Sequence, residues 1–296
     1  MSYGKHQTFF LRSNWIYKGI SSFDDPKYTK DFLVQVKKYY KVMGLGSSMY
    51  KSLRYWLEAA NIIEYAEGNH HLTYFGEYLK SFDLNADTIF SKLILHYFLV
   101  SDIHINSMEQ SHSFYWFFNV NTDRVFDKQY LISEIEKWDK EAKSSKNKVN
   151  FTSVNTIKSD VDVLINTYTK LMPSHPEDKN YSPLAELGLL KEEGKNIFKL
   201  PLSSAKYSLD AFMYFILLWK ENGEDLLVDS LVETPSSIGK AFNLGRSDIL
   251  ELLETMIKKK YPIEISRTNN LNYLKITTEK SAKDFMLSRT EGRYES

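Results

Sequence analysis

The stretch GLGSSMYKSLRYWLEAANIIEYAEGNHHLTYFGEYL, residues Gly44–Leu79, decides the fold that we expect for the N-terminal part of this chain. Gly44 and Gly46 break the chain at a tight turn, because glycine accepts backbone angles that other residues avoid. Ser47 or Ser48 can cap the helix that follows. The apolar side chains of that helix recur at helical spacing, at Met49, Leu53, Trp56, Leu57 and Ala60.

A short hairpin is predicted after this helix. The pair Ile62–Ile63 leads into a turn at Glu67–Asn69, and the returning segment ends at Leu72. Thr73 then begins a further helix. Another helix, capped by Thr29, precedes the glycine turn and has apolar residues at Phe32, Leu33, Val36, Tyr39, Tyr40 and Met43. Helix, turn, helix and hairpin, in this order, are typical of a winged helix.

The same order recurs at the C-terminal end. Ser236 can cap a short helix, and Gly245 marks the turn into a longer one. Two strand-like runs, Tyr261–Ser266 and Leu271–Thr278, follow and are joined through Thr268–Asn270. The longer helix has apolar residues at Ile249, Leu252, Leu253, Met256 and Ile257. The sequence therefore predicts a second winged-helix unit.

The middle of the chain is predicted to be helical. An amphipathic helix over Thr152–Leu171 is a weaker candidate for a further winged-helix-like unit, and no strands are obvious after it. Lys140–Asn150 is polar and rich in lysine, which is typical of an exposed loop. Asp87–Val100 and Leu209–Trp219 read as apolar helices, and we expect the aromatic run Ser113–Val120 to be buried.

The expected fold is mainly α with small β-hairpins, an α+β protein in which tandem winged-helix units are joined by helical segments. Residues 1–82 are expected to form an N-terminal winged-helix DNA-binding domain. Residues 83–222 would form a helical middle domain, and residues 223–296 a C-terminal winged-helix domain.

Composition excludes several classes of protein. The 296 residues contain no cysteine, which removes disulfides, thiolate nucleophiles and cysteine-ligated metal sites. No apolar run approaches the length of a membrane span, and no signal peptide is visible, so we expect a soluble, cytoplasmic protein. Neither a Walker motif nor GxGxxG occurs, so nucleotide hydrolysis and dinucleotide chemistry are not supported.

Charge is balanced overall and uneven along the chain. The whole sequence has 38 basic and 38 acidic residues, whereas residues 1–60 carry ten basic and four acidic side chains, a net charge of +6. A local excess of this kind can focus a positive surface on one face. Double-stranded DNA is therefore the expected partner.

The helix after the glycine turn supplies the expected DNA contacts. Lys51 and Arg54 lie opposite its apolar stripe, and the helix N-terminus with Ser47 and Ser48 suits a phosphate. The alternative is an ordinary solvated helix with a well-made cap. Arg246 begins the corresponding helix of the second unit and is included among the expected contacts.

Arg12 and Lys18, with Trp15 between them, form an aromatic and basic cluster that could continue the same surface. The alternative is an arginine packed on Trp15 as a cation–π pair. Both alternatives stay open for the sequence alone.

A DNA-cleaving site needs carboxylates that hold Mg²⁺ or Mn²⁺ and activate water. Asp160 and Asp162 are the closest acidic pair, but residues two apart on a helix point to different faces. Glu251 and Glu254 are correctly spaced and typical of a solvated face. No nuclease motif of the PD–ExK, HNH or GIY–YIG kind is visible, so the catalytic residues stay unassigned.

The seven histidines match no metal-binding spacing. His70 and His71, beside the predicted hairpin turn, are expected to be exposed. His96 lies on an apolar helix, where a histidine is more often part of the core. His104 and His112 lie eight residues apart and form no HxxxH or HExxH pattern.

Six short stretches keep an order and a spacing that are familiar. They are KHQTFFLRSNWIYKG (Lys5–Gly19), LGSSMYKSLRYW (Leu45–Trp56), LTYFGEYL (Leu72–Leu79), LILHYFLV (Leu93–Val100), SDVDVLINTY (Ser159–Tyr168) and SPLAELGLL (Ser182–Leu190). In this order they resemble a bacterial family, formerly of unknown function, that is found in DNA phosphorothioation gene clusters. The resemblance runs from about residue 5 to residue 287.

The resemblance implies a nicking endonuclease that opens one DNA strand so that sulfur can enter the backbone, in a modification or antiviral defence system. It also implies a cysteine desulfurase, an ATPase and an ATP pyrophosphatase-type enzyme as partners. Without cysteine or a phosphate-binding loop, this chain can be neither the sulfur carrier nor the ATPase. The alternative function is a non-catalytic winged-helix adaptor or regulator that recruits partner proteins to DNA. A simple transcription repressor is a third alternative, for which the chain is long.

Overall fold

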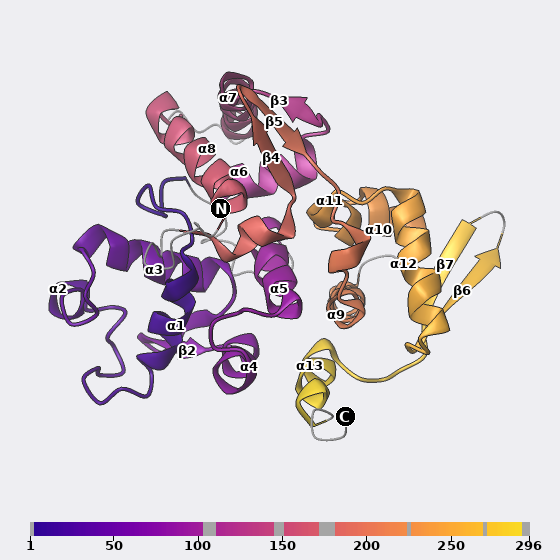
Figure 1. Ribbon diagram of the computed structural model, residues 1–296, viewed down its shortest axis with the longest axis horizontal. Coiled ribbons are helices and arrows are strands. Elements are labelled where there is room, and N and C mark those ends of the chain that lie inside the picture. The colour runs from indigo at the N-terminus through magenta and orange to yellow at the C-terminus, as the bar shows by residue number, and fades with distance from the viewer. Residues whose placement is uncertain are drawn as a thin grey trace.

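The computed structural model describes residues 3–102, 111–144, 151–171, 181–223, 226–268 and 271–291 of the chain. Helices dominate these ranges, and short antiparallel strands pair in three small sheets (Figure 1). The expected α+β class with mainly helical content is confirmed. None of the helices in these ranges has the length and apolar content needed to cross a bilayer.

The N-terminal part has the expected order of helix, glycine turn, helix and hairpin. Its elements are α1 (Ser13–Ser21), α2 (Val36–Tyr39), α3 (Ser47–Ala59), β1 (Ile63–Ala66), β2 (Asn69–Leu72) and α4 (Tyr74–Phe82). The turn residues Glu67 and Gly68 both have positive φ, as a two-residue hairpin requires. Thr73 caps α4, because its hydroxyl accepts from the Gly76 amide at 3.0 Å. The predicted hairpin and the start of the next helix are confirmed.

The helix predicted from Thr29 onward is wrong in its length. Only α2 is an α-helix here, and the residues before it form turns. Side chains of α3 explain the difference. The Tyr50 hydroxyl donates to the Phe32 carbonyl at 2.8 Å and so holds the turn that contains Phe32. Arg54 donates in the same way to the Leu33 carbonyl at 3.2 Å. Contacts between distant residues therefore override the local helical spacing.

The predicted serine caps are displaced by one residue in both units. Gly46 is the N-cap of α3, so Ser47 is already helical and both Ser47 and Ser48 are exposed. Ser237, and not Ser236, caps the short helix of the second unit, accepting a backbone amide of the first turn at 3.2 Å. Ser236 has a φ of +66° and is buried.

The middle of the chain holds helices and a sheet that was not predicted. Strands β3, β5 and β4 pair in this order, and each is two to four residues long, too short to give a strand pattern in the sequence. The loop expected over Lys140–Asn150 is wrong in part, because α7 continues to Ser144; residues 145–150 lie outside the described residues. The elements are α5 (Ile89–Val100), α6 (His112–Tyr115), η1 (Trp116–Val120), β3 (Val125–Phe126), α7 (Lys128–Ser144), α8 (Val154–Thr169), η2 (Pro183–Leu187), β4 (Leu190–Glu193), β5 (Asn196–Lys199), η3 (Ser204–Lys206) and α9 (Leu209–Glu221).

The C-terminal part repeats the order of the N-terminal part, as expected. A short helix leads through a turn into a 13-residue helix, and the paired strands β6 and β7 follow. The elements are α10 (Val228–Glu233), α11 (Ile238–Phe242), α12 (Arg246–Lys258), β6 (Ile263–Thr268), β7 (Leu271–Ile276) and α13 (Ala282–Glu291).

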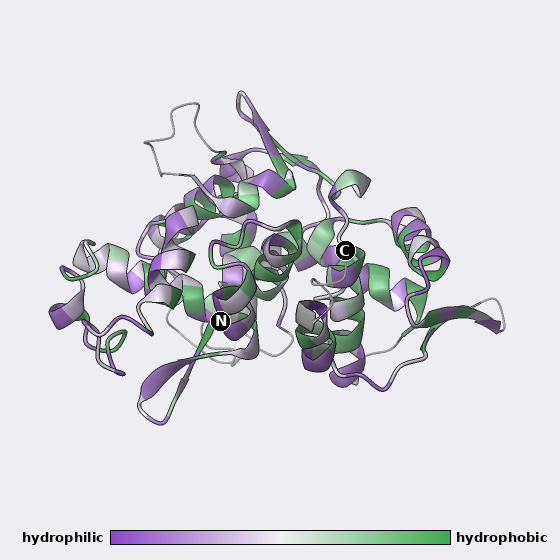
Figure 2. Ribbon diagram, turned by 60° about the horizontal axis from the view of Figure 1, so that its bottom comes forward, coloured by the Kyte–Doolittle hydropathy of each residue, from purple (hydrophilic) through white to green (hydrophobic). Residues whose placement is uncertain are grey.

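One hydrophobic core runs through all three parts. The apolar helices α5 and α9 lie at its centre, where Figure 2 shows the hydrophobic residues concentrated. The Nε2 of His96 donates to the Ala241 carbonyl at 2.6 Å, so its Nδ1 accepts from the Tyr168 hydroxyl at 2.7 Å. Burial lowers the pKa of His96 to about 3, which keeps the ring neutral. The expectation of a core histidine is confirmed, whereas the division into three domains stays a prediction.

Candidate nucleic-acid interface

The glycine turn before α3 and the turn before α12 share one backbone geometry. In the first, Gly44 has a φ of +70° and the next amide donates to the Tyr40 carbonyl at 2.9 Å. In the second, Asn243 has a φ of +57° and the next amide donates to the Gly239 carbonyl at 2.9 Å. In both turns, a residue in the left-handed region follows the preceding helix. A hydrogen bond from the next amide to the carbonyl five residues earlier closes the turn. The helices that follow are both 13 residues long, so α3 and α12 occupy equivalent positions.

The exposed edge of α3 carries three of the predicted DNA contacts. Ser47, Ser48 and Lys51 are exposed, and Lys51 forms no ion pair with any acid in the described part of the chain. Arg54 is only 33 % exposed, because it donates to the Leu33 carbonyl and lies 3.7 Å from the Glu58 carboxylate. Arg54 therefore holds the fold as well as presenting charge. Fewer side chains of α3 are therefore free to contact DNA than the sequence predicted.

A row of lysines on α2 extends this edge. Lys37 and Lys38 on α2, and Lys41 just after it, are exposed, and α2 contacts α3. We call Lys37, Lys38, Lys41 and Lys51 the α2–α3 basic edge. The sequence did not single out the α2 lysines, although the excess positive charge of residues 1–60 was a signal for them.

Arg12 and Lys18 are engaged within the protein. The guanidinium of Arg12 lies 5.3 Å from the centre of the Trp15 ring and 5.4 Å from that of Phe9, which is the cation–π alternative. The Lys18 ammonium donates to the Met43 carbonyl at 3.3 Å and so ties α1 to the glycine turn. Their roles as DNA contacts stay predictions.

The exposed face of α12 differs in charge from the edge of α3. Arg246 is exposed, but its Nε donates to the Asp229 carboxylate at 2.8 Å. Glu251 and Glu254 are exposed further along the helix, as the sequence predicted for a solvated face. The second unit therefore presents acidic side chains where a DNA-reading helix needs donors and positive charge.

The first hairpin presents acidic residues and buries one of its histidines. Glu64 and Glu67 are exposed on it, which disfavours contact with phosphates. The exposure predicted for His70 is wrong: it is 6 % exposed, and its Nε2 lies 2.6 Å from the Glu58 carboxylate. The alternation of side chains along β2 turns it inward, toward the end of α3, and leaves His71 exposed as predicted.

Among the described residues, no group of three or more His, Asp or Glu side chains is placed to hold a metal ion. Asp160 is fully buried with its Oδ1 2.9 Å from the Nε2 of His6, while Asp162 pairs at the surface with Lys128. The two carboxylates point apart, as predicted. His104 lies outside the described residues.

Comparisons with known proteins agree with the family resemblance. A crystal structure of SspB has 18 % sequence identity and a TM-score of 0.78, with 99 % of this chain and 88 % of that chain covered. A magnesium ion-bound SspB crystal structure has 20 % identity and a TM-score of 0.77, with the same coverage. No curated protein sequence matches. The model of a family described as a protein of unknown function, DUF4007, matches residues 3–290, and the chain therefore belongs to the DUF4007 family.

Proposed function

We propose that this protein is a DNA-binding component of a bacterial phosphorothioation or phage-defence system and that it nicks one strand of duplex DNA. The α2–α3 basic edge carries the DNA-binding part of the proposal. Its four lysines are exposed, α2 contacts α3, and the first amides of α3 suit a phosphate. In this proposal the two units act as winged helices, and α3 is the helix that enters the major groove.

Nicking rests on the likeness to SspB and on the family resemblance. One of the two similar structures is a magnesium ion-bound SspB. Divalent metals activate water and stabilise the leaving oxygen in phosphodiester hydrolysis. No catalytic step is assigned to particular residues, because the described part of the chain holds no set of metal ligands. The partners in this proposal are a cysteine desulfurase, an ATPase and an ATP pyrophosphatase-type enzyme.

A supercoiled-plasmid assay tests the proposal. The full chain with Mg²⁺ or Mn²⁺ is expected to give open-circle product, and EDTA to abolish it. Replacing Lys37, Lys41 and Lys51 with alanine should lower the rate at subsaturating DNA, because these side chains hold the duplex.

The matched control replaces three exposed lysines of the C-terminal part with alanine: Lys258, Lys259 and Lys283. This control changes the net charge by the same amount and should leave the nicking rate unchanged. A wild-type chain that binds plasmid but gives no open-circle product with either metal would contradict the nicking part of the proposal.

A second candidate function is a non-catalytic adaptor. The acidic face of α12 favours it, because Glu251 and Glu254 suit a basic protein surface better than DNA. An adaptor keeps salt-sensitive DNA binding, yields no nick, and loses partner recruitment when both glutamates become glutamine.

A further inference from the structure

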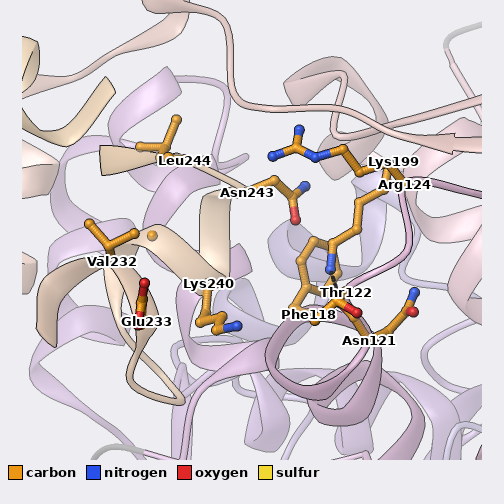
Figure 3. A pocket seen from close by; sticks show the side chains of 12 residues that line it. Phe118, Asn121, Thr122, Arg124, Lys199, Val232, Glu233, Lys240, Asn243 and Leu244 are labelled. Carbon is orange, nitrogen blue, oxygen red and sulfur yellow. Dashed lines mark hydrogen bonds between the residues drawn. The ribbon is translucent and has the colours of Figure 1, made fainter. Parts of the chain in front are cut away.

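A cavity of about 230 Å³ lies between the three-stranded sheet and the turn before α12. Its walls come from the segment before β3, from the end of β5, and from α10, α11 and the turn at Asn243–Gly245 (Figure 3). It is a separate place from the α2–α3 basic edge, and nothing in the proposed DNA contact uses it. Its lining contains three cations: Arg124, Lys199 and Lys240.

None of the three cations forms an ion pair with an acid in the described part of the chain. Glu233 is the one carboxylate of the lining, and it is exposed. The nearby Asp123 carboxylate accepts from the Tyr130 hydroxyl. Positive charge gathered around a hollow without paired acids favours an anion as occupant.

The buried ammonium of Lys199 is destabilised by the neighbouring cations when the cavity holds no anion. It is 8 % exposed, and its Nζ donates to the Phe117 carbonyl at 2.8 Å and to the Asn121 carbonyl at 2.9 Å. These two bonds leave one of its three hydrogens free when the amine is protonated. Burial, and then the charges of Lys240 and Arg124, lower the pKa of Lys199 to about 7. An anion in the cavity would offset this repulsion.

The walls are held in place before any ligand binds. A Cβ on Gly239 would lie 2.5 Å from the Val232 carbonyl oxygen, so α11 and α10 meet backbone to backbone beside the cavity. The Nδ2 of Asn243 donates to the Leu200 carbonyl at 2.8 Å and fixes the turn against the end of β5. Figure 3 shows the Arg124 guanidinium and the Lys240 ammonium on different sides of the hollow. A cavity with fixed backbone walls does not have to be formed when a ligand binds, which lowers the ordering cost of binding.

We propose that this cavity binds a phosphoryl group, either as free phosphate or as the terminal phosphate of a nucleotide or DNA strand. A dianion matches the charge of the lining better than a carboxylate does. Its three or more oxygens can accept from Arg124, Lys199 and Lys240 together, and a guanidinium fork suits two phosphate oxygens. The volume fits a phosphate group and is small for a whole nucleotide.

Calorimetric titration of the full chain with inorganic phosphate, at constant ionic strength, tests the proposal. The wild type is expected to bind, and the double variant Arg124→Gln/Lys240→Met to bind roughly 30-fold or more weakly, because each lost charge-assisted bond lowers affinity. Lys258→Met/Lys259→Met is the matched control and should keep wild-type affinity. Absence of binding in the wild type, or equal binding in both double variants, would overturn the proposal.

Two further arms use the wild type alone. Sulfate keeps its charge between pH 6 and 8. Its affinity for the cavity should therefore fall as pH rises through this range and Lys199 loses its proton. The charged groups facing Lys199 are Arg124, Lys240 and Asp123. A flat profile with unchanged affinity would remove Lys199 from the site. Competition against bound phosphate by a 5′-phosphorylated oligonucleotide, but not by its 5′-hydroxyl form, identifies a DNA end as the source. Failure of both oligonucleotides to compete excludes a DNA end and leaves free phosphate or a nucleotide as the source.

Discussion

The two units of this protein share a backbone plan and differ in the surroundings and charge of their second helix. Ser52 and Tyr55 of α3 are buried, because the N-terminal segment and α6 lie against that side. The equivalent residues of α12, Glu251 and Glu254, are exposed. What remains free on α3 is a basic edge, whereas α12 presents an acidic face. A helix–turn–helix and hairpin alone therefore do not determine what a unit binds.

This difference assigns DNA to the first unit in our proposal. Lysines that contact phosphates add affinity through the release of counterions, whereas exposed glutamates repel the DNA backbone. The second unit contributes its turn to the wall of the cationic cavity instead.

The largest effect is expected at the glycines on which both units pack. A Cβ on Gly76 would overlap the Ile62 carbonyl oxygen, and one on Gly239 would lie 2.5 Å from the Val232 carbonyl oxygen. Gly76→Ala and Gly239→Ala should each lower the free energy of unfolding by about 3 kcal/mol, because backbone must move. Urea denaturation measures this. Gly46→Ala, with open space and an ordinary φ, is the control; a variant as stable as that control would contradict the packing at its site.

A pH-dependent loss of stability is expected at His96, which links α5 to the second unit. Its folded-state pKa of about 3 lies below the unfolded value of about 6.5, so the unfolded chain takes up the proton first. The contribution is complete above pH 6.5 and falls by about 1.4 kcal/mol per unit as pH decreases toward 5. His96→Gln should flatten this slope in denaturation curves. An equally steep slope in the variant would show that other groups cause it.

A smaller change in the free energy of unfolding should distinguish Arg54 from Lys51, the two cations of α3. Arg54→Met should lower the free energy of unfolding by about 1 kcal/mol, because the Leu33 carbonyl loses its donor. Lys51→Met should change it by less than about 0.5 kcal/mol, since the side chain is exposed and has no described ionic partner. Thermal denaturation of both variants checks this. Equal losses would mean that Lys51 also supports the fold.

The smallest effect is expected from exchanging charge on α12. Glu251→Lys/Glu254→Lys should leave the free energy of unfolding within about 0.5 kcal/mol, since both side chains are exposed. Non-specific affinity for duplex DNA should rise by roughly three- to tenfold at low salt, because repulsion becomes attraction. Fluorescence anisotropy measures the change. No gain in affinity would show that the shape of the second unit, and not its charge, keeps DNA away.

Long-range contacts explain which elements of the fold the sequence predicted and which it did not. Periodicity and turn residues located α3, α8, α12 and both hairpins, because each has a strong local pattern. The turns before α2 were missed because Tyr50 and Arg54, distant in sequence, take the carbonyls of Phe32 and Leu33. The sheet of β3, β4 and β5 was missed because its strands are only two to four residues long.

The candidate site was predictable only in part for the same reason. Lys51 was found because it lies opposite an apolar stripe. Segments that are far apart in the chain come together to bury His70 and to gather Arg124, Lys199 and Lys240. No local spacing in the sequence therefore predicts either feature.

The salt dependence of duplex DNA binding shows whether the α2–α3 basic edge contacts the DNA backbone. We expect Lys37→Ala/Lys41→Ala/Lys51→Ala to weaken binding by roughly 100-fold near 0.1 M salt and to reduce the slope of log K against log salt by about 2.7. Lys258→Ala/Lys259→Ala/Lys283→Ala removes the same charge from the C-terminal part and should bind as the wild type does. Equal binding and equal slopes for the two triple variants would contradict the assignment of DNA to the α2–α3 basic edge.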